Sequence, residues 1–281
     1  MFLDSIAKLG LLRHDPETNV LACFPFDVRR GIVCSVAAFL NEVAQSAGAV
    51  LTGAAHLNFA MECIGEGFRL PLDHSSVIST CLDLYTRWVK DERARPPAMK
   101  EDFDRYAVRM LEQLTLLFQN RAKTHSETQT QADLCVRALL VFGMVLRMRL
   151  PRQVWDRVLK LLLGATDSLV NPPVASATAE DRSLLLGVTD SVLRPATSED
   201  EAFSKALRAR VLYELSKAVL LSRCRDDDLW QTLKVLYRGW LASPETTAQW
   251  NATMLALTQF VLAQLYTQPP AAPPLSMALE G

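Results

Sequence analysis

Apolar residues recur at spacings of three and four along most of the chain, which is the period of an amphipathic helix. Stripes of this kind cover 28–43, 57–68, 77–89, 103–118, 134–146, 154–169, 184–192, 203–219, 229–241 and 250–265. Only Val20 to Phe24 resembles a strand, and a single strand has no partner to pair with. The pattern therefore predicts an all-α fold of about ten helices.

The links between these predicted helices are mostly short, so consecutive helices are expected to pack as antiparallel hairpins. No strict repeat and no tetratricopeptide or ankyrin signature is present. An irregular armadillo- or HEAT-like α-solenoid fits best. We expect one scaffold domain over residues 1–267, and a Pro/Ala-rich tail or linker over residues 268–281.

A fixed corner is predicted between the second and third helices. Pro71 disfavours helical geometry at Leu70, so the second helix must end before it. Asp73 and Ser75 are suitable residues to cap the helix that follows. The two glycines Gly65 and Gly67 fit the end of the preceding helix. The stretch thus predicts a helical hairpin, with no catalytic motif in it.

Charge and composition narrow the class of protein. Lys and Arg total 30 and Asp and Glu total 31, a balance that argues against nucleic acid as the main ligand. The unbroken apolar runs are far below the ~20 residues of a transmembrane helix. The N-terminus lacks the basic and apolar regions of a secretory signal. The six cysteines include no CxxC pair and several fall on apolar helix faces, which indicates buried free thiols in a reducing, cytoplasmic location.

The strongest candidate for chemistry is the cluster Asp226–Asp228. All-α isoprenoid synthases hold magnesium with aspartate-rich helices, but such a site needs another carboxylate one turn further on. The residues Leu229 to Thr232 supply none. The alternative is that these aspartates cap a helix. The histidines have no ligand spacing, and no phosphate loop or nucleophile motif is present. We expect no catalytic residue, no metal site and no cofactor.

Two further groups have a structural and a functional interpretation. A basic run could dock an acidic partner or a membrane surface, although the solvated side of two helices explains it as well. It consists of Arg147, Arg149, Arg152, Arg157 and Lys160. The tryptophans lie on apolar faces, where core packing is the default role. They are Trp88, Trp155, Trp230, Trp240 and Trp250.

The predicted corner and the helix after it carry a family resemblance. The chain has Phe59, Met61, Glu62 and Gly67, then Leu70-Pro71-Leu72-Asp73, and finally Cys81, Asp83, Tyr85, Thr86 and Trp88. This pattern resembles the N-terminal domain of the Ral GTPase-activating protein subunits, most closely the non-catalytic beta subunit. Weaker similarities follow in the same order, at Trp155 to Pro173, Leu186 to Val188, Trp230, Trp240 and Gln249 to Thr258.

The resemblance implies a non-catalytic scaffold in a Ral-type GTPase-activating complex. Its expected partner is the catalytic alpha-type subunit, in a heterodimer that acts on a Ral-type small GTPase. Family members extend well beyond this domain, and catalysis is attributed to an asparagine of the alpha subunit near its far C-terminus. No position of this chain corresponds to that asparagine. The alternatives are an unrelated helical adaptor and an isoprenoid-synthase-like enzyme.

Overall fold

The computed structural model describes residues 20–43, 50–170, 198–222, 226–241 and 244–266. In these segments the regular structure consists of ten α-helices and short 3₁₀ turns, with no strand. The prediction of an all-α fold is confirmed. The solenoid arrangement stays a prediction. The helix expected over residues 184–192 and the tail at 268–281 lie outside the described residues.

The chain divides into two compact units, which we describe separately. The first comprises Met1–Ala122 with Leu140–Val145, and the second comprises Lys123–Leu139 with Leu146–Gly281. Helix α8 (His125–Val145) contributes to both units. The single scaffold domain over residues 1–267 therefore stays a prediction.

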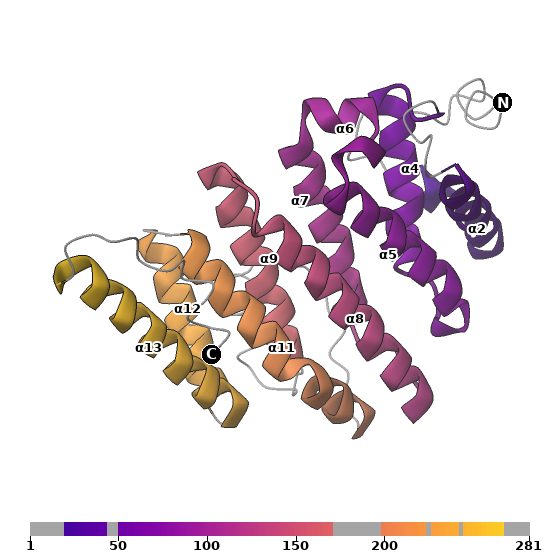
Figure 1. Ribbon diagram of the computed structural model, residues 1–281. Coiled ribbons are helices and arrows are strands. Elements are labelled where there is room, and N and C mark those ends of the chain that lie inside the picture. The colour runs from indigo at the N-terminus through magenta and orange to yellow at the C-terminus, as the bar shows by residue number, and fades with distance from the viewer. Residues whose placement is uncertain (1–19, 44–49, 171–197, 223–225, 242–243, 267–281) are drawn as a thin grey trace. The chain divides into compact units, whose positions relative to one another are not determined.

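The first unit is built around α4. Its complete helices are α2 (Phe26–Glu42), α4 (Ala54–Gly67), α5 (Ser75–Lys90), α6 (Pro97–Glu101) and α7 (Phe103–Leu114). All four of the others pack against α4, and α2 also packs against α5 (Figure 1). From Leu57 to Gly67 every residue of α4 is buried except Glu62. The core of this unit therefore lies along α4.

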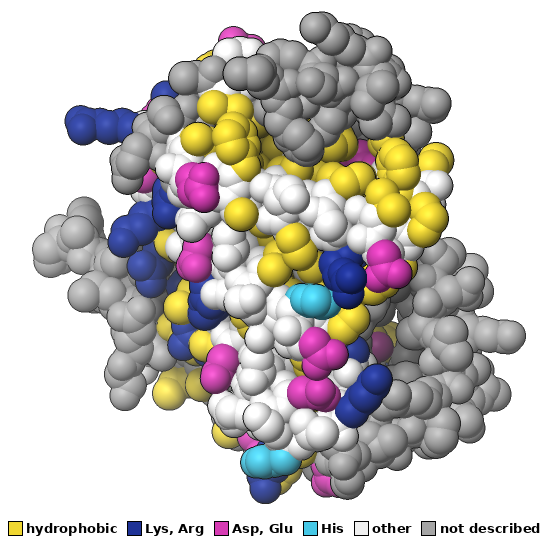
Figure 2. Space-filling view, turned by 90° about the vertical axis from the view of Figure 1, so that its right-hand side faces the viewer, with side chains coloured by type: hydrophobic (Ala, Val, Ile, Leu, Met, Phe, Trp, Pro, Cys, Tyr) yellow, Lys and Arg dark blue, Asp and Glu magenta, His cyan; other side chains and the backbone are white. Residues whose placement is uncertain are grey.

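The outer side of α2 is only partly polar. Phe26 is 44% exposed and Val28 is 48% exposed at the start of this helix. Figure 2, which looks at the molecule from that side, shows hydrophobic side chains in several patches in the upper half, with charged side chains scattered among them.

The corner between α4 and α5 forms as predicted, but its capping differs. A 3₁₀ turn, η3 (Leu72–His74), leads directly into α5, and the amide of His74 donates to the carbonyl of Pro71 at 2.9 Å. No side chain caps the start of α5. The expectation that Asp73 and Ser75 cap this helix is therefore wrong, because the preceding 3₁₀ turn already supplies the main-chain hydrogen bonds at this point.

The glycine pair at the end of α4 allows close packing. A Cβ built on Gly67 would lie 2.5 Å from Sγ of Cys81 on α5. No real side chain fits at that distance, so a glycine is what lets α5 approach α4 here. The glycines do end the helix, as predicted, and they also set the spacing between two helices.

The second unit contains most of α8 and four further helices. These are α9 (Arg152–Val170), α11 (Ser198–Ser222), α12 (Asp227–Trp240) and α13 (Pro244–Tyr266). Helix α11 packs against both α9 and α13, and α12 packs against α9 (Figure 1). The core of this unit is therefore centred on α9 and α11.

Helix α8 begins earlier than the apolar pattern predicts. The apolar stripe predicts a helix only from residue 134, whereas α8 starts at His125. A capping box explains the difference: the amide of Glu127 donates to Oγ1 of Thr124 at 3.2 Å, and the amide of Lys123 donates to Oε2 of Glu127 at 2.6 Å. The first turns of the helix are polar, yet Thr128 and Gln131 in them are buried. The T-x-x-E sequence was the signal that could have revealed this start.

Candidate functional site

The family-signature residues form the inner lining and the rim of the corner in the first unit. These residues are Leu70, Pro71, Leu72, Asp73, Asp83, Tyr85, Thr86 and Trp88. Of these eight, Leu70, Leu72, Tyr85 and Trp88 are buried, while Pro71, Asp73 and Asp83 are exposed. Oγ1 of Thr86 donates to the carbonyl of Leu82 within α5. The ring of Tyr85 contacts the rings of Trp88 and of Phe68, with centroid distances of 5.8 and 5.5 Å. The signature therefore builds a core.

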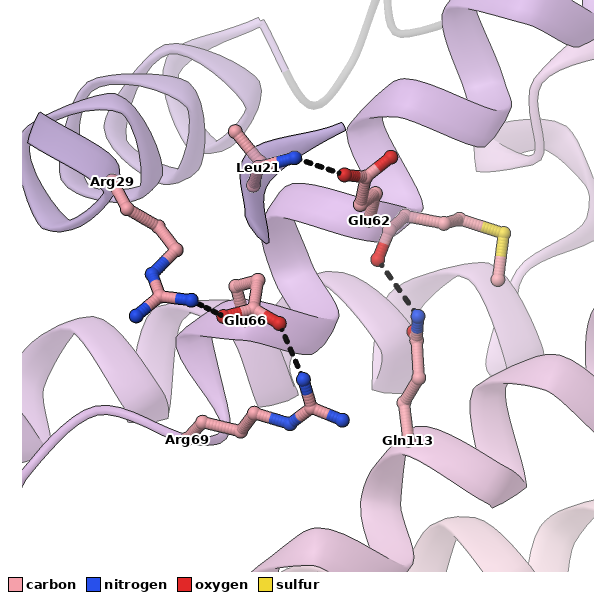
Figure 3. Close-up of polar contacts among 7 residues, drawn as sticks. Leu21, Arg29, Glu62, Glu66, Arg69 and Gln113 are labelled. Atoms are coloured by element: carbon pink, nitrogen blue, oxygen red, sulfur yellow. Dashed lines mark hydrogen bonds and ion pairs between the residues drawn. The ribbon is translucent and has the colours of Figure 1, made fainter. Parts of the chain in front are cut away.

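Tyr85 is the polar centre of this core. Its hydroxyl donates to Oε1 of Gln113 on α7 and lies 3.5 Å from the carbonyl oxygen of Met61 on α4. Nε2 of Gln113 donates to the same carbonyl at 3.0 Å (Figure 3). Burial raises the pKa of the Tyr85 hydroxyl well above its ordinary value, so it remains a neutral donor. One tyrosine and one glutamine thus join three helices.

Sequence analysis missed Gln113. It lies among the buried residues Met110, Leu114 and Leu117, so an amide on an apolar stripe was the available signal. Gly65 makes room for it, because a Cβ on Gly65 would lie 2.5 Å from Nε2 of Gln113. Gly65 therefore leaves space for the side-chain amide of Gln113, in addition to its place near the end of α4.

Glu62 of α4 fixes the segment before the first helix. Its Oε1 accepts a hydrogen bond of 2.6 Å from the amide of Leu21, in the 3₁₀ turn η1 (Leu21–Cys23) (Figure 3). Desolvation raises the pKa of the Glu62 carboxyl, although this main-chain hydrogen bond and the charge of Arg109 act in the opposite direction. Glu62 therefore holds the N-terminal turn against α4.

Glu66, one turn further along α4, binds two arginines. Its Oε1 lies 2.6 Å from Nη1 of Arg69, in the corner, and its Oε2 lies 3.5 Å from Nη1 of Arg29, on α2 (Figure 3). The carboxylate is buried, with a side-chain exposure of 7%. Because a buried carboxylate needs such partners, this ion-pair cluster fixes the relative positions of α2, α4 and the corner.

Arg95 secures the end of the signature helix. Its Nε donates to the carbonyl of Trp88 at 2.7 Å, and its Nη2 donates to the carbonyl of Val89 at 3.0 Å. The guanidinium also lies over the ring of Phe103, 3.8 Å from its centroid. Burial lowers the pKa of Arg95. Sequence analysis did not single out Arg95.

The two buried thiols of this unit are packing groups. Cys63 and Cys81 are buried, and desolvation raises the pKa of Cys81 to about 12 and that of Cys63 well above its ordinary value. A thiol that stays protonated is a poor nucleophile and a poor metal ligand. The prediction of buried thiols is confirmed for Cys81, and for Cys135 on α8, whereas Cys23 is exposed.

The polar groups around the corner have a structural role. Glu62 and Glu66 each bind main-chain or arginine donors, and the described residues include no group of three or more His, Cys, Asp or Glu placed to hold a metal ion. No helix in the described segments is long and apolar enough to cross a membrane. The signature residues therefore bring together hydrogen bonds and ion pairs that join helices.

The second unit has its own buried polar contact. Nε1 of Trp240 on α12 donates to Oδ1 of Asp167 on α9 at 2.9 Å, and both residues are buried. Tyr237 connects this pair to α13, because its ring lies 5.0 Å from that of Trp240 and 4.7 Å from that of Trp250. The core role predicted for the tryptophans holds for Trp88 and Trp240, while the other three are partly exposed.

A buried charge cluster lies on α11. Glu214 is 2% exposed and lies within ion-pair distance of Lys217, at 3.8 Å, and of Arg210, at 3.2 Å. Desolvation raises the pKa of the Glu214 carboxyl, opposed by both cations. Glu214 and Lys217 are buried, whereas the Arg210 side chain is 41% exposed, so the cluster extends from the interior of the unit to its surface.

The aspartates 226–228 cap a helix. Oδ1 of Asp226 accepts hydrogen bonds from the amides of Asp228 and Leu229, at 3.0 and 3.3 Å. Asp227 and Asp228 occupy the first turn of α12, where negative charge complements the helix dipole. This confirms the capping interpretation.

The basic run lies on the surface. All five of its cations, between Arg147 and Lys160, are exposed, as expected for the solvated side of two helices.

Comparison with known proteins identifies the relatives of this chain. Residues 178–268 match the family model of the RALGAPB N-terminal domain. A Rap-GAP domain-containing protein of Dictyostelium discoideum is 34% identical over 111 residues, which make up 39% of this chain and 7% of that protein. The chain thus spans a small part of the length of this relative. No solved structure matches.

These matches confirm the resemblance to the Ral GTPase-activating protein N-terminal domain. The family match covers the described parts of α11, α12 and α13, and includes Trp240 and Tyr237. It does not include the Leu70–Trp88 stretch, which was the main basis of the resemblance in the sequence. The resemblance therefore rests on the sequence pattern in the first unit and on the family match in the second.

Proposed function

We propose that this chain, as a relative of the RALGAPB N-terminal domain, is a non-catalytic scaffold module of a Ral-type GTPase-activating complex in the cytoplasm. The observation that carries the proposal is the family match over residues 178–268. The chain would support small-GTPase regulation through protein–protein contacts with a catalytic alpha-type subunit. It would not itself hydrolyse GTP.

The internal construction of the chain supports this proposal. The charged and polar groups that sequence analysis quoted for the family, such as Glu62 and Tyr85, join helices to one another. In the matched region Trp240 joins α12 to α9 in the same manner. A scaffold needs a rigid arrangement of helices, and networks of this kind provide it.

Copurification tests the proposal. A tagged alpha-type subunit of a Ral GTPase-activating complex is mixed with the full chain and recovered on an affinity resin, with a Rap-type GTPase-activating protein as the matched bait. The proposal predicts stoichiometric recovery of the chain with the alpha-type subunit only. An unrelated helical adaptor would be recovered with both baits or with neither, and either result contradicts the proposal.

The isoprenoid-synthase alternative has a separate test. It requires Asp226 to Asp228 to bind magnesium, whereas Oδ1 of Asp226 is engaged by two main-chain amides. Calorimetric titration with Mg²⁺ should give no specific heat, in the wild type and in Asp227→Ala alike. Specific binding that Asp227→Ala abolishes would contradict the scaffold proposal.

A further inference from the structure

The last described helix has an unusual composition. From Thr246 to Tyr266, α13 contains no Asp, Glu, Lys, Arg or His. The adjacent α12 is different, because it presents Lys234 and Arg238 as exposed charges. A helix on the surface of a globular protein normally has a charged or strongly polar face. The composition of α13 is therefore typical of a helix that other protein surfaces cover on more than one side.

Among the described residues of the second unit, only those on the inner side of α13 cover this helix. Thr246, Thr253 and Ala256 are buried where the helix packs against α11. On the other side Leu255 is 59% exposed and Leu262 is 48% exposed. Leu255 has the largest exposed fraction among the exposed large hydrophobic side chains of the described segments. Apolar surface without charges around it is typical of a protein–protein contact.

One face of α13 is symmetric about Leu255. Ala248 precedes Leu255 by the same number of residues as Leu262 follows it, and these three residues lie on that face of the helix. In an antiparallel pair of α13 helices centred on Leu255, the large Leu262 of each copy would meet the small Ala248 of the other. The exposed amides of Asn251 and Gln259 would face each other in the same way and could form hydrogen bonds.

We propose that the outer face of α13, made up of Ala248, Asn251, Leu255, Gln259 and Leu262, docks a second copy of this chain in a two-fold antiparallel contact. A two-fold contact needs a self-complementary surface, and the pairing of Leu262 of each copy with Ala248 of the other supplies one. The absence of charge removes the like-charge repulsion that a symmetric pairing otherwise creates.

The size of the face determines the strength of the contact. A helix of 23 residues is about 35 Å long, so one helix face buries on the order of 500 Å² per copy. This is less than the ~800 Å² per partner of a standard stable complex. Interfaces this small are typical of weak, transient association, so the dimer should form only at micromolar or higher concentrations of the chain. The contact does not depend on the proposed GTPase-activating complex.

Sedimentation of the full chain across a concentration series tests this inference. The wild type should pass from monomer to dimer over the micromolar range, and Leu255→Asp should weaken association at least ~10-fold, because it buries a charge at the two-fold axis. Val235→Asp is the matched control: Val235 is an apolar residue of α12 that is 52% exposed. It should associate as the wild type does. Circular dichroism verifies that both variants fold.

A cysteine probe tests the symmetry directly. In Leu255→Cys the two introduced thiols meet at the axis, so an added oxidant should join residue 255 of one copy to residue 255 of the other, as peptide mass spectrometry can show. Val235→Cys should give no such product. A wild type that stays monomeric at several hundred micromolar overturns the proposal, and so does a dimer that Leu255→Asp leaves unchanged. Dimerisation only after deletion of residues 267–281 would overturn it in favour of coverage by the tail.

Discussion

The two units of this chain keep their helices in place by different means. In the first, a network of main-chain, glutamine, tyrosine, glutamate and arginine groups joins α2, α4, α5 and α7. In the second, an indole–carboxylate hydrogen bond joins α12 to α9, an ion pair between Arg208 and Glu245 joins α11 to α13, and aromatic contacts link α12 to α13. The first unit therefore gathers its polar contacts around one helix, α4, whereas the second places single polar contacts between separate pairs of helices. Substitutions should reveal this difference.

The largest expected effect is at Trp240. Trp240→Phe removes the donor to Asp167 and leaves space in the core, and we expect a loss of about 3 kcal/mol in the free energy of unfolding. Trp88→Phe in the first unit loses volume and ring contacts but no such hydrogen bond, so about 1 to 2 kcal/mol is expected. Urea unfolding followed by circular dichroism measures both. Equal losses would contradict the contrast between the units.

The second largest effect should come from Gln113. Gln113→Leu removes the acceptor of the Tyr85 hydroxyl and the donor to the Met61 carbonyl, which should lower the free energy of unfolding by about 2 kcal/mol. Adding Tyr85→Phe to this variant should restore part of the loss, since the orphaned hydroxyl is then gone. A double-mutant cycle gives the coupling energy. Strictly additive effects would show that the two side chains act independently.

The pH dependence of stability should be alike in the two units, because each contains one glutamate whose pKa is raised by burial. The pKa of Glu62 is raised in the folded chain, so the folded state holds its proton more strongly than the unfolded state does. Its contribution to stability is therefore most favourable below the ordinary pKa of a glutamate, and declines as pH rises through the raised value. Glu62→Gln should remove this pH dependence of the free energy of unfolding, while its side-chain oxygen can still accept a hydrogen bond from the Leu21 amide.

Glu214 provides the comparison in the second unit. The pKa of its carboxyl is also raised by desolvation. Glu214→Gln should therefore also reduce the decline of the free energy of unfolding with rising pH. Unfolding free energies between pH 4 and pH 8 measure each slope. A steeper decline in stability with pH in either glutamine variant would contradict the assigned cause.

The smallest effects concern helix starts. Asp226→Ala removes the cap of α12 and should lower the free energy of unfolding by about 1 kcal/mol. Asp73→Ala, in the exposed turn before α5, should change it by less than about 0.5 kcal/mol, because no side chain caps that helix. Thermal unfolding is sensitive enough to distinguish the two variants.

Most helices could be predicted from the period of apolar residues, because burial of one face determines both the period and the fold. The start of α8 could not be predicted this way, since its first turns are polar and depend on the capping box at Thr124 and Glu127. The capping of the corner was assigned incorrectly because a 3₁₀ turn and a side-chain cap satisfy the same amides.

Only part of the polar network of the first unit could be predicted from the sequence. Glu62 and Tyr85 belong to the sequence pattern of the family resemblance, but their partners lie far away along the chain: Leu21 for Glu62, and Gln113 for Tyr85. Local sequence carries no information on such pairings. The same is true of Asp167 and Trp240, which are separated by 73 residues.

The central claim is that this chain contributes architecture and no catalysis to a GTPase-activating complex. Its most direct test is single-turnover hydrolysis of GTP bound to a Ral-type GTPase, with the chain alone, the alpha-type subunit alone, and the two together. We predict that the chain alone leaves the intrinsic rate unchanged, and that the mixture hydrolyses GTP faster than the alpha-type subunit alone. Acceleration by the chain alone, or a mixture no faster than the alpha-type subunit, would contradict the account.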